Sequence, residues 1–263
     1  MPTDTVPGSD VVTVIDTMMF GARRSTAAFL VDADETVLID TGLSTCYDAL
    51  RDGLAEAGTA IAEVDTVIAT HVHLDHVGAL SRVVDDADPR VLCHPNAERF
   101  LTDPEATERL VEKSREAMGP LADAYGTAEA VDPDRVATVV DGDVIDCGGV
   151  ALEVMHTPGH APHHVSLFEP GDRLLFVIDE GCVYADGHEY PTTPPPNFDL
   201  DATLASFDRF RERDPEVLLY GHYGANAAGV DAIDRHERAL HDWVDTVEEA
   251  RATHDDEDAV VEA

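Results

Sequence analysis

Four side chains of metal-ligand type fall within six residues of this 263-residue chain. They lie in the run His71-Val72-His73-Leu74-Asp75-His76, which directly follows a predicted buried strand at residues 65–70. A tight loop at the end of a buried strand points such nitrogen and oxygen donors into one small volume, and these donors suit zinc, iron or manganese. A single histidine is more often a core or surface residue, but four such side chains together predict a metal site.

Three later segments each bring one more donor to the end of a predicted strand. His160 follows the turn Thr157-Pro158-Gly159, Asp179 follows the apolar residues 174–178, and His222 follows residues 218–221. A carboxylate at the end of an apolar strand is costly to bury unless it is paired or bound to a metal. These three side chains are therefore expected to complete the site begun by residues 71–76.

The order of these four segments resembles that of the metallo-β-lactamase superfamily, including glyoxalase II. Residues 38–42, Leu-Ile-Asp-Thr-Gly, also resemble the first motif of that family, and the resemblance extends from residue 11 to about residue 253. It implies an α/β fold, an αββα sandwich, with two divalent ions at one edge between the sheets. Zinc is the expected metal, with iron or manganese as alternatives. The seven ligands that the resemblance implies are His71, His73 and His160 for the first ion, Asp75, His76 and His222 for the second, and Asp179 as a bridge between them.

The resemblance also implies a reaction. Two adjacent cations lower the pKa of a bridging water toward about 7, and the resulting hydroxide attacks a carbonyl or phosphoryl centre. We therefore expect a hydrolase that cleaves a small-molecule thioester, ester or lactone, with Asp75 and Asp179 as catalytic carboxylates. Glutathione thioesters are not favoured, because residues 223–263 are too few for the helical glutathione-binding domain of glyoxalase II.

Two other activities share this motif set. A persulfide dioxygenase-like oxidoreductase would use a single iron, here held by His71, His160 and Asp179. An RNA-processing nuclease would use the same metal motif, but it is less favoured because phosphate binding needs a basic surface. A non-catalytic scaffold is the least favoured alternative, because every ligand is present.

Further residues are candidates for supporting the ligands or contacting substrate. Asp40 is expected to hydrogen-bond a ligand or the ligand loop, with a simple turn cap as the alternative. His164 could line the site or lie at a strand edge, Tyr223 could contact substrate or pack, and Glu180 adds a carboxylate beside Asp179. His94 is assigned equally to the pocket rim or to the surface. Ile178 and Ala79 replace glycines that are frequent in the family, but neither change removes a ligand.

The hydrophobic pattern predicts the elements that position these residues. Strands are expected at residues 11–16, 28–31, 36–40, 65–70, 90–93, 136–140, 150–156, 164–168, 174–179 and 216–220, and helices at 45–58, 200–213 and 230–253. A helical insertion, interrupted at Pro104, is expected at about residues 95–130. Residues 190–198 read as a stiff polyproline-like loop. We predict a single domain over residues 1–254 and a disordered acidic tail at 255–263.

The charge of the chain is extreme. There are 54 acidic and 17 basic residues, giving a formal net charge of −37, and Lys113 is the single lysine. Such self-repulsion opposes compaction at ordinary ionic strength, but in molar salt the screening length falls to about 3 Å. The composition therefore favours a halophilic protein over an acidic protein with a basic partner.

Composition also limits location and partners. No run of 18 apolar residues and no signal-peptide pattern is present, and the four cysteines show no paired spacing. The chain is therefore expected to be cytoplasmic and to act on a small molecule rather than on nucleic acid or a membrane. Whether it forms a homodimer is left open.

Overall fold

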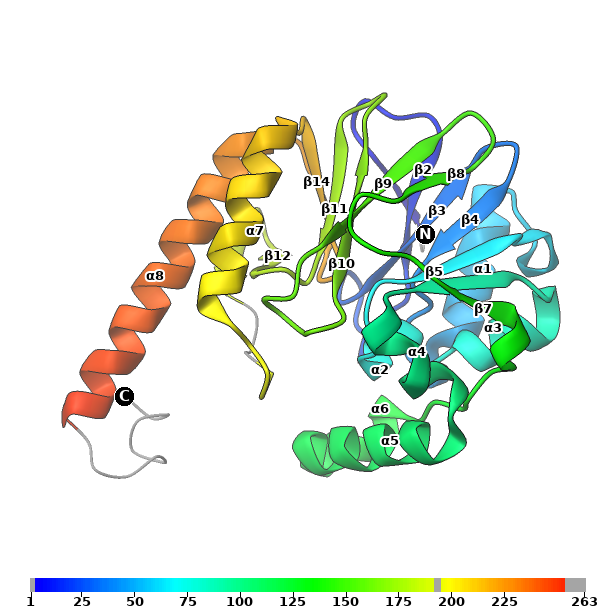
Figure 1. Ribbon diagram of the computed structural model, residues 1–263, viewed down its shortest axis with the longest axis horizontal. Coiled ribbons are helices and arrows are strands. Elements are labelled where there is room, and N and C mark those ends of the chain that lie inside the picture. The colour runs from blue at the N-terminus through cyan, green and yellow to red at the C-terminus, as the bar shows by residue number, and fades with distance from the viewer. Residues whose placement is uncertain (1–2, 192–194, 254–263) are drawn as a thin grey trace.

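Two β-sheets pack face to face, and helices cover their outer sides (Figure 1). The computed structural model describes residues 3–191 and 195–253. The first sheet has seven strands in sequence order: β1 (Thr3–Thr5), β2 (Val12–Asp16), β3 (Ala27–Asp32), β4 (Thr36–Ile39), β5 (Thr66–Ala69), β6 (Arg90–Cys93) and β7 (Val136–Thr138). This arrangement confirms the expected αββα sandwich.

The second sheet has six strands in the order β15-β14-β11-β10-β9-β8. Its members are β8 (Val144–Asp146), β9 (Ala151–His156), β10 (Val165–Glu169), β11 (Leu174–Ile178), β14 (Val217–Tyr220) and β15 (Gly224–Asn226). A separate hairpin is formed by β12 (Cys182–Ala185) and β13 (His188–Pro191).

The core between the sheets follows from the two-residue period of each strand. In β11, Leu174, Phe176 and Ile178 face the first sheet, whereas Leu175 and Val177 face the helices on the other side. Because both faces are covered, this strand is apolar throughout. Phe176 meets Phe29 of β3 across the sandwich, edge to face, at 5.4 Å between ring centroids.

The helices form an outer layer on each side and an insertion at one end (Figure 1). On the first sheet lie α1 (Tyr47–Ala57), α3 (Leu80–Ala87) and α4 (Pro95–Thr102). On the second lie α7 (Leu200–Arg213) and α8 (Gly229–Thr253). The insertion continues through α5 (Pro104–Met118) and α6 (Ala122–Tyr125), while α2 (Leu74–Val77) is the short helix inside the histidine motif. Single turns of 3-10 helix are η1 (Met19–Gly21), η2 (Ser44–Cys46), η3 (Ile61–Glu63), η4 (Gly119–Leu121) and η5 (Pro133–Arg135).

Some local structure differs from the expectation. The elements that the pattern did not predict are β1, α2, α3, β8, the hairpin β12–β13 and β15; most are short, so they hold too few residues to show a period. Residues 190 and 191 belong to β13 rather than to a polyproline loop, because the turn at Gly187 pairs Tyr190 with Val183. Residues 192–194 and the predicted tail at 255–263 lie outside the described residues. No helix in the described part of the chain is both long and apolar enough to cross a bilayer.

Strand direction sets the position of the candidate ligands. β4 and β5 are parallel, as are β11 and β14, and β9 reaches the same edge because β10 runs antiparallel to both β9 and β11. The loops after β5, β9, β11 and β14 therefore meet at one edge of the sandwich. These are the loops that carry the histidine motif, His160, Asp179 and His222.

Candidate metal centre

The structure brings all seven predicted ligands into one cluster. Their ligand atoms form three overlapping groups within 4.8 Å: His71, His73 and His160; His71, His76 and Asp179; and Asp75, His76 and His222. Four loops contribute, those that follow β5, β9, β11 and β14. Folding thus joins residues that lie up to 151 positions apart, as the numbers 71 and 222 show.

The first group has the spacing of a metal coordination shell. Nδ1 of His73 lies 3.1 Å from Nε2 of His71 and 3.0 Å from Nε2 of His160. Nitrogen ligands at zinc–nitrogen distances of about 2.0–2.1 Å in a tetrahedron lie about 3.3 Å from one another. The three imidazole nitrogens therefore sit at nearly the separation that one ion requires.

Asp179 lies between two ligand groups. The first group is His71, His73 and His160, and the second group is Asp75, His76 and His222. In the second group, Nε2 of His222 is 3.1 Å from Oδ2 of Asp75, and Nε2 of His76 is 3.9 Å from that oxygen. Oδ2 of Asp179 is 3.3 Å from His76, 3.4 Å from His222, 3.7 Å from His160 and 3.9 Å from His71, measured to each Nε2. One carboxylate oxygen thus faces imidazoles of both groups.

The electrostatics of the cluster fit bound cations. Burial lowers the pKa of His71, His73 and His160, so their imidazoles are neutral and can ligate a metal. For His222, burial is outweighed by Asp179 and Asp75, which raise its pKa to about 10. These carboxylates favour a positive charge beside them. In addition, Oδ1 of Asp179 is buried and has no hydrogen-bond partner among the described residues.

Two of the histidines are oriented by acceptors behind them. Nδ1 of His76 lies 2.8 Å from Oδ2 of Asp40, and Nδ1 of His222 lies 3.0 Å from the backbone oxygen of Ser25. Both acceptors require a proton on Nδ1, which leaves the lone pair of Nε2 directed at the cluster. Asp40 therefore hydrogen-bonds a candidate ligand, as the sequence predicted. It also accepts hydrogen bonds from Thr70, at 2.9 Å from the backbone nitrogen and 2.8 Å from the hydroxyl.

His164 supports Asp179 from the buried side of the centre. Its Nε2 accepts from the backbone nitrogen of Asp179 at 3.4 Å, and its Nδ1 is 2.8 Å from the hydroxyl of Thr157. His164 is fully buried, so it contacts the frame of the site rather than its open face.

Glu180 also lies behind the ligands. Its Oε2 accepts from the backbone nitrogen of His160 at 3.0 Å, and burial raises its pKa to about 8. The loop over it must be glycine at position 159, because an added Cβ would come within 2.5 Å of Oε1 of Glu180 and 2.0 Å of the hydroxyl of Thr203. Of the two roles considered for Glu180, its contacts match support of a ligand rather than contact with substrate, since Glu180 is completely buried.

The side chains of Tyr223 and His94 hydrogen-bond to residues outside the ligand cluster. The hydroxyl of Tyr223 donates to the carboxylate of Asp4, and its ring belongs to the core between the sheets. The side chain of His94 caps α4 by accepting from the backbone nitrogen of Asn96 at 3.2 Å, and its ring stacks on His156. Of the two roles considered for Tyr223, substrate contact and packing, its contacts match packing.

One residue at the centre was not found from the sequence. Tyr125, at the end of α6, donates its hydroxyl to Oδ1 of Asp75 at 2.7 Å. Burial, together with the charge of Asp75, raises the pKa of this hydroxyl far above its ordinary value, so it stays protonated. A tyrosine 49 residues after His76 has no spacing relation to the motif, and no sequence pattern singled it out.

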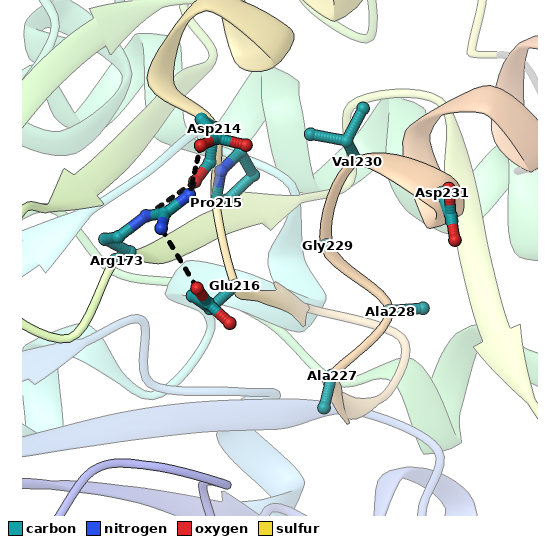
Figure 2. Close-up of a pocket in the computed structure, with 9 residues that line it drawn as sticks. All are labelled: Arg173, Asp214, Pro215, Glu216, Ala227, Ala228, Gly229, Val230 and Asp231. Carbon is teal, nitrogen blue, oxygen red and sulfur yellow. Dashed lines mark hydrogen bonds and ion pairs between the residues drawn. The ribbon is translucent and has the colours of Figure 1, made fainter.

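A cavity of about 250 Å³ lies at the opposite ends of two strands that lead to the centre. Its lining includes Arg173, just before β11, and Glu216, just before β14 (Figure 2). Arg173 is held there by ion pairs to Glu216 at 3.0 Å and to Asp214 at 2.5 Å. The one basic side chain in this lining is thus already neutralised.

Known proteins share both the sequence pattern and the fold. The metallo-beta-lactamase fold-containing protein ST1585 of Sulfurisphaera tokodaii is 32% identical over 190 residues, which is 72% of this chain and 69% of that protein. The crystal structure of ST1585 superposes with a TM-score of 0.69 over 84% of this chain and 81% of that chain, at 27% identity.

Two further relatives carry functional names. The probable metallo-hydrolase YqgX of Bacillus subtilis is 29% identical over 164 residues, covering 62% of this chain and 68% of that protein. The acyl-coenzyme A thioesterase MBLAC2 of Bos taurus is 32% identical over 167 residues, covering 59% of this chain and 56% of that protein. A family model covers residues 21–222, from the loop before β3 to the last of the clustered histidines. The fold, the clustered histidine and aspartate side chains and this match together show that the chain belongs to the metallo-beta-lactamase superfamily.

Proposed function

We propose that this protein is a dinuclear-metal hydrolase that cleaves a small-molecule thioester, ester or lactone. The observation that carries the proposal is the position of Asp179, whose Oδ2 lies 3.3–3.9 Å from imidazole nitrogens of both ligand groups. The names of the relatives, probable metallo-hydrolases and an acyl-coenzyme A thioesterase, agree with this reaction class.

The ligand sets suit two divalent ions, and we propose zinc, with iron or manganese as alternatives. His71, His73 and His160 would hold one ion, Asp75, His76 and His222 the other, and Asp179 would contact both. Bound there, divalent ions lower the pKa of water toward about 7 and polarise a substrate carbonyl.

The side chains of the protein prepare this chemistry. Asp40 and the Ser25 carbonyl hold a proton on Nδ1 of His76 and His222, so that Nε2 is the ring atom directed at the cluster and available to an ion. His164 holds the backbone beside Asp179 in place. The geometry is therefore set before a substrate arrives, which is the condition for strong electrostatic stabilisation of a developing anion.

The charge of the chain bears on the kind of substrate and on the salt concentration in which the protein works. A formal net charge of −37 repels polyanions and needs screening, so we propose a neutral or weakly charged substrate and a cytoplasm rich in salt. A glyoxalase II-like position within the superfamily also remains a proposal.

Metal analysis combined with a substrate panel tests this function. Protein purified without chelator should hold close to two equivalents of metal, and it should hydrolyse a member of a thioester, ester and lactone panel. Chelation should abolish that turnover, and added zinc should restore it. One equivalent of iron together with dioxygen uptake on a persulfide would establish the oxygenase instead, and cleavage restricted to a phosphodiester would establish the nuclease.

A further inference from the structure

Asp75 is shared between the ligand cluster and the helical insertion. Its Oδ2 faces the cluster, 3.1 Å from Nε2 of His222. Its Oδ1 accepts the hydroxyl of Tyr125, at 2.7 Å, from α6. A free carboxylate can rotate and present either oxygen, or both, to a cation. The hydroxyl biases that choice, because its hydrogen bond uses a lone pair of Oδ1 and holds this oxygen toward α6.

The backbone around Tyr125 is fixed from the insertion side. Arg115 of α5 donates to the backbone oxygen of Ala122 at 3.2 Å and to that of Gly126 at 3.4 Å. Its guanidinium also pairs with Asp123 at 2.6 Å. These bonds hold both ends of α6, so the tyrosine at its end has little freedom to move.

The same segment is tied to the core of the sandwich. The hydroxyl of Thr45 donates to the backbone oxygen of Ala124 at 2.9 Å, and the hydroxyl of Ser44 accepts from the backbone nitrogen of Thr127 at 3.0 Å. The ring of Tyr125 packs against the buried cluster of Leu43, Cys46 and Leu74. Because Leu74 directly precedes Asp75, this cluster includes the helix that carries the carboxylate, and the hydroxyl of Tyr125 contacts the carboxylate itself.

We propose that Tyr125 is a positioning residue for the second metal ion. Its hydroxyl holds Asp75 with Oδ2 directed at the ligand cluster and so makes the helical insertion part of the metal centre. The inference rests on the proposed function, since it requires that Asp75, His76 and His222 bind an ion. Residues that orient a ligand in this way typically contribute about 10–100-fold to metal affinity.

The test is a metal titration of apo protein with Zn²⁺, followed by calorimetry or by competition with a chromophoric chelator. Wild-type protein should show two binding events, and His222→Ala should identify the event of the second group by losing it. Tyr125→Phe should weaken that event by at least about tenfold and leave the other unchanged. The unchanged event shows that the variant is folded.

A matched control is available in the chain. Tyr47 also donates its hydroxyl to a carboxylate, that of Asp86, but it lies in α1, which carries none of the clustered side chains. Tyr47→Phe should leave both binding events unchanged. With Co²⁺ in place of zinc, the visible absorption assigned to the second site should change in Tyr125→Phe and not in Tyr47→Phe.

Three results would overturn the inference, and they differ from one another. If the affinities of both events and KM were all unchanged in Tyr125→Phe, Asp75 would not need Tyr125 to bind the second ion. Unchanged metal affinities with a raised KM would make Tyr125 a substrate contact instead. A single wild-type event would refute the two-metal function itself, and the inference with it.

Discussion

Replacing Asp40 with asparagine should disable the second ligand group without changing any ligand. Asp40 is buried, with 1% of its surface exposed, and adopts a left-handed backbone conformation with φ of 59°. Asparagine is among the residues that best tolerate this conformation, and its size is the same, so the backbone should be retained. The change therefore isolates the chemistry of one oxygen atom.

The hydrogen bonds of Asp40 determine which way the new amide points. Oδ1 accepts from the backbone nitrogen of Thr70 at 2.9 Å, and that donor cannot be reversed. The amide oxygen must therefore stay at this place, and the NH₂ group takes the place of Oδ2, 2.8 Å from Nδ1 of His76. An NH₂ group donates, so His76 must move its proton to Nε2. A protonated Nε2 has no lone pair for a metal.

We expect the affinity for the second ion to fall by about 10–100-fold, which corresponds to about 1.4–2.7 kcal/mol. The protein should also lose about 1.5–3 kcal/mol of unfolding free energy, the usual contribution of hydrogen bonds to a charged group. The assays are a Zn²⁺ titration of apo protein and chemical unfolding in molar salt.

Glu169→Gln provides the control. Glu169 is a buried carboxylate that accepts from the backbone nitrogens of Gly171 and Asp172, both at 2.6 Å, in the turn between β10 and β11. That turn lies at the end of β11 opposite Asp179, so stability should fall and metal affinity should not. If Asp40→Asn bound the second ion as well as wild-type protein does, the tautomer argument would be refuted. Equal weakening in both variants would show a general effect of destabilisation.

Three more predictions concern the bridge, acid stability and salt. Asp179→Ala should release at least one metal ion and lose far more turnover than His94→Ala, because Asp179 faces both ligand groups whereas His94 caps a helix; metal content and kcat measure this. Burial lowers the pKa of His236 to about 4, against about 6.5 when unfolded, so the unfolded chain binds the extra proton between these values. Stability should therefore fall as the pH falls from about 6.5 toward 4, at up to about 1.4 kcal/mol per pH unit, and His236→Gln should reduce that slope in chemical unfolding. The net charge of −37 predicts that the thermal unfolding midpoint rises from low to molar potassium chloride.

Each of these predictions has a clear contrary result. Full metal content and near-normal turnover in Asp179→Ala would remove the bridging role. An acid slope unchanged by His236→Gln would mean that this buried imidazole, which lies 2.7 Å from the Tyr220 hydroxyl, is not what destabilises the protein in acid. An unfolding midpoint that ignores salt would contradict the halophilic interpretation.

Local pattern was enough to predict the sandwich and to select the ligand residues. The histidine motif needs no partner to be recognised, because its four donors lie within one short run, residues 71–76. Asp179 could be inferred from burial alone, since β11 is apolar on both faces and leaves its terminal carboxylate inside the protein. Asp40 was identified by the resemblance of residues 38–42 to the first motif of the family.

Contacts between segments far apart in the sequence had to come from the tertiary structure. The backbone oxygen of Ser25 holds His222 across 197 positions, and Tyr125 reaches Asp75 across 50. A backbone carbonyl has no sequence pattern, and a tyrosine at the end of a short helix looks the same whether it packs or binds. Tyr223 and Glu180 are neighbours of ligands in the sequence, but neither side chain faces the cluster. Tyr223 contacts Asp4, and Glu180 contacts the backbone of His160. Residue type and strand order determined which side chains arrive at the edge of the sandwich, whereas the packing of distant loops decided which of them face the metal centre and what holds them there.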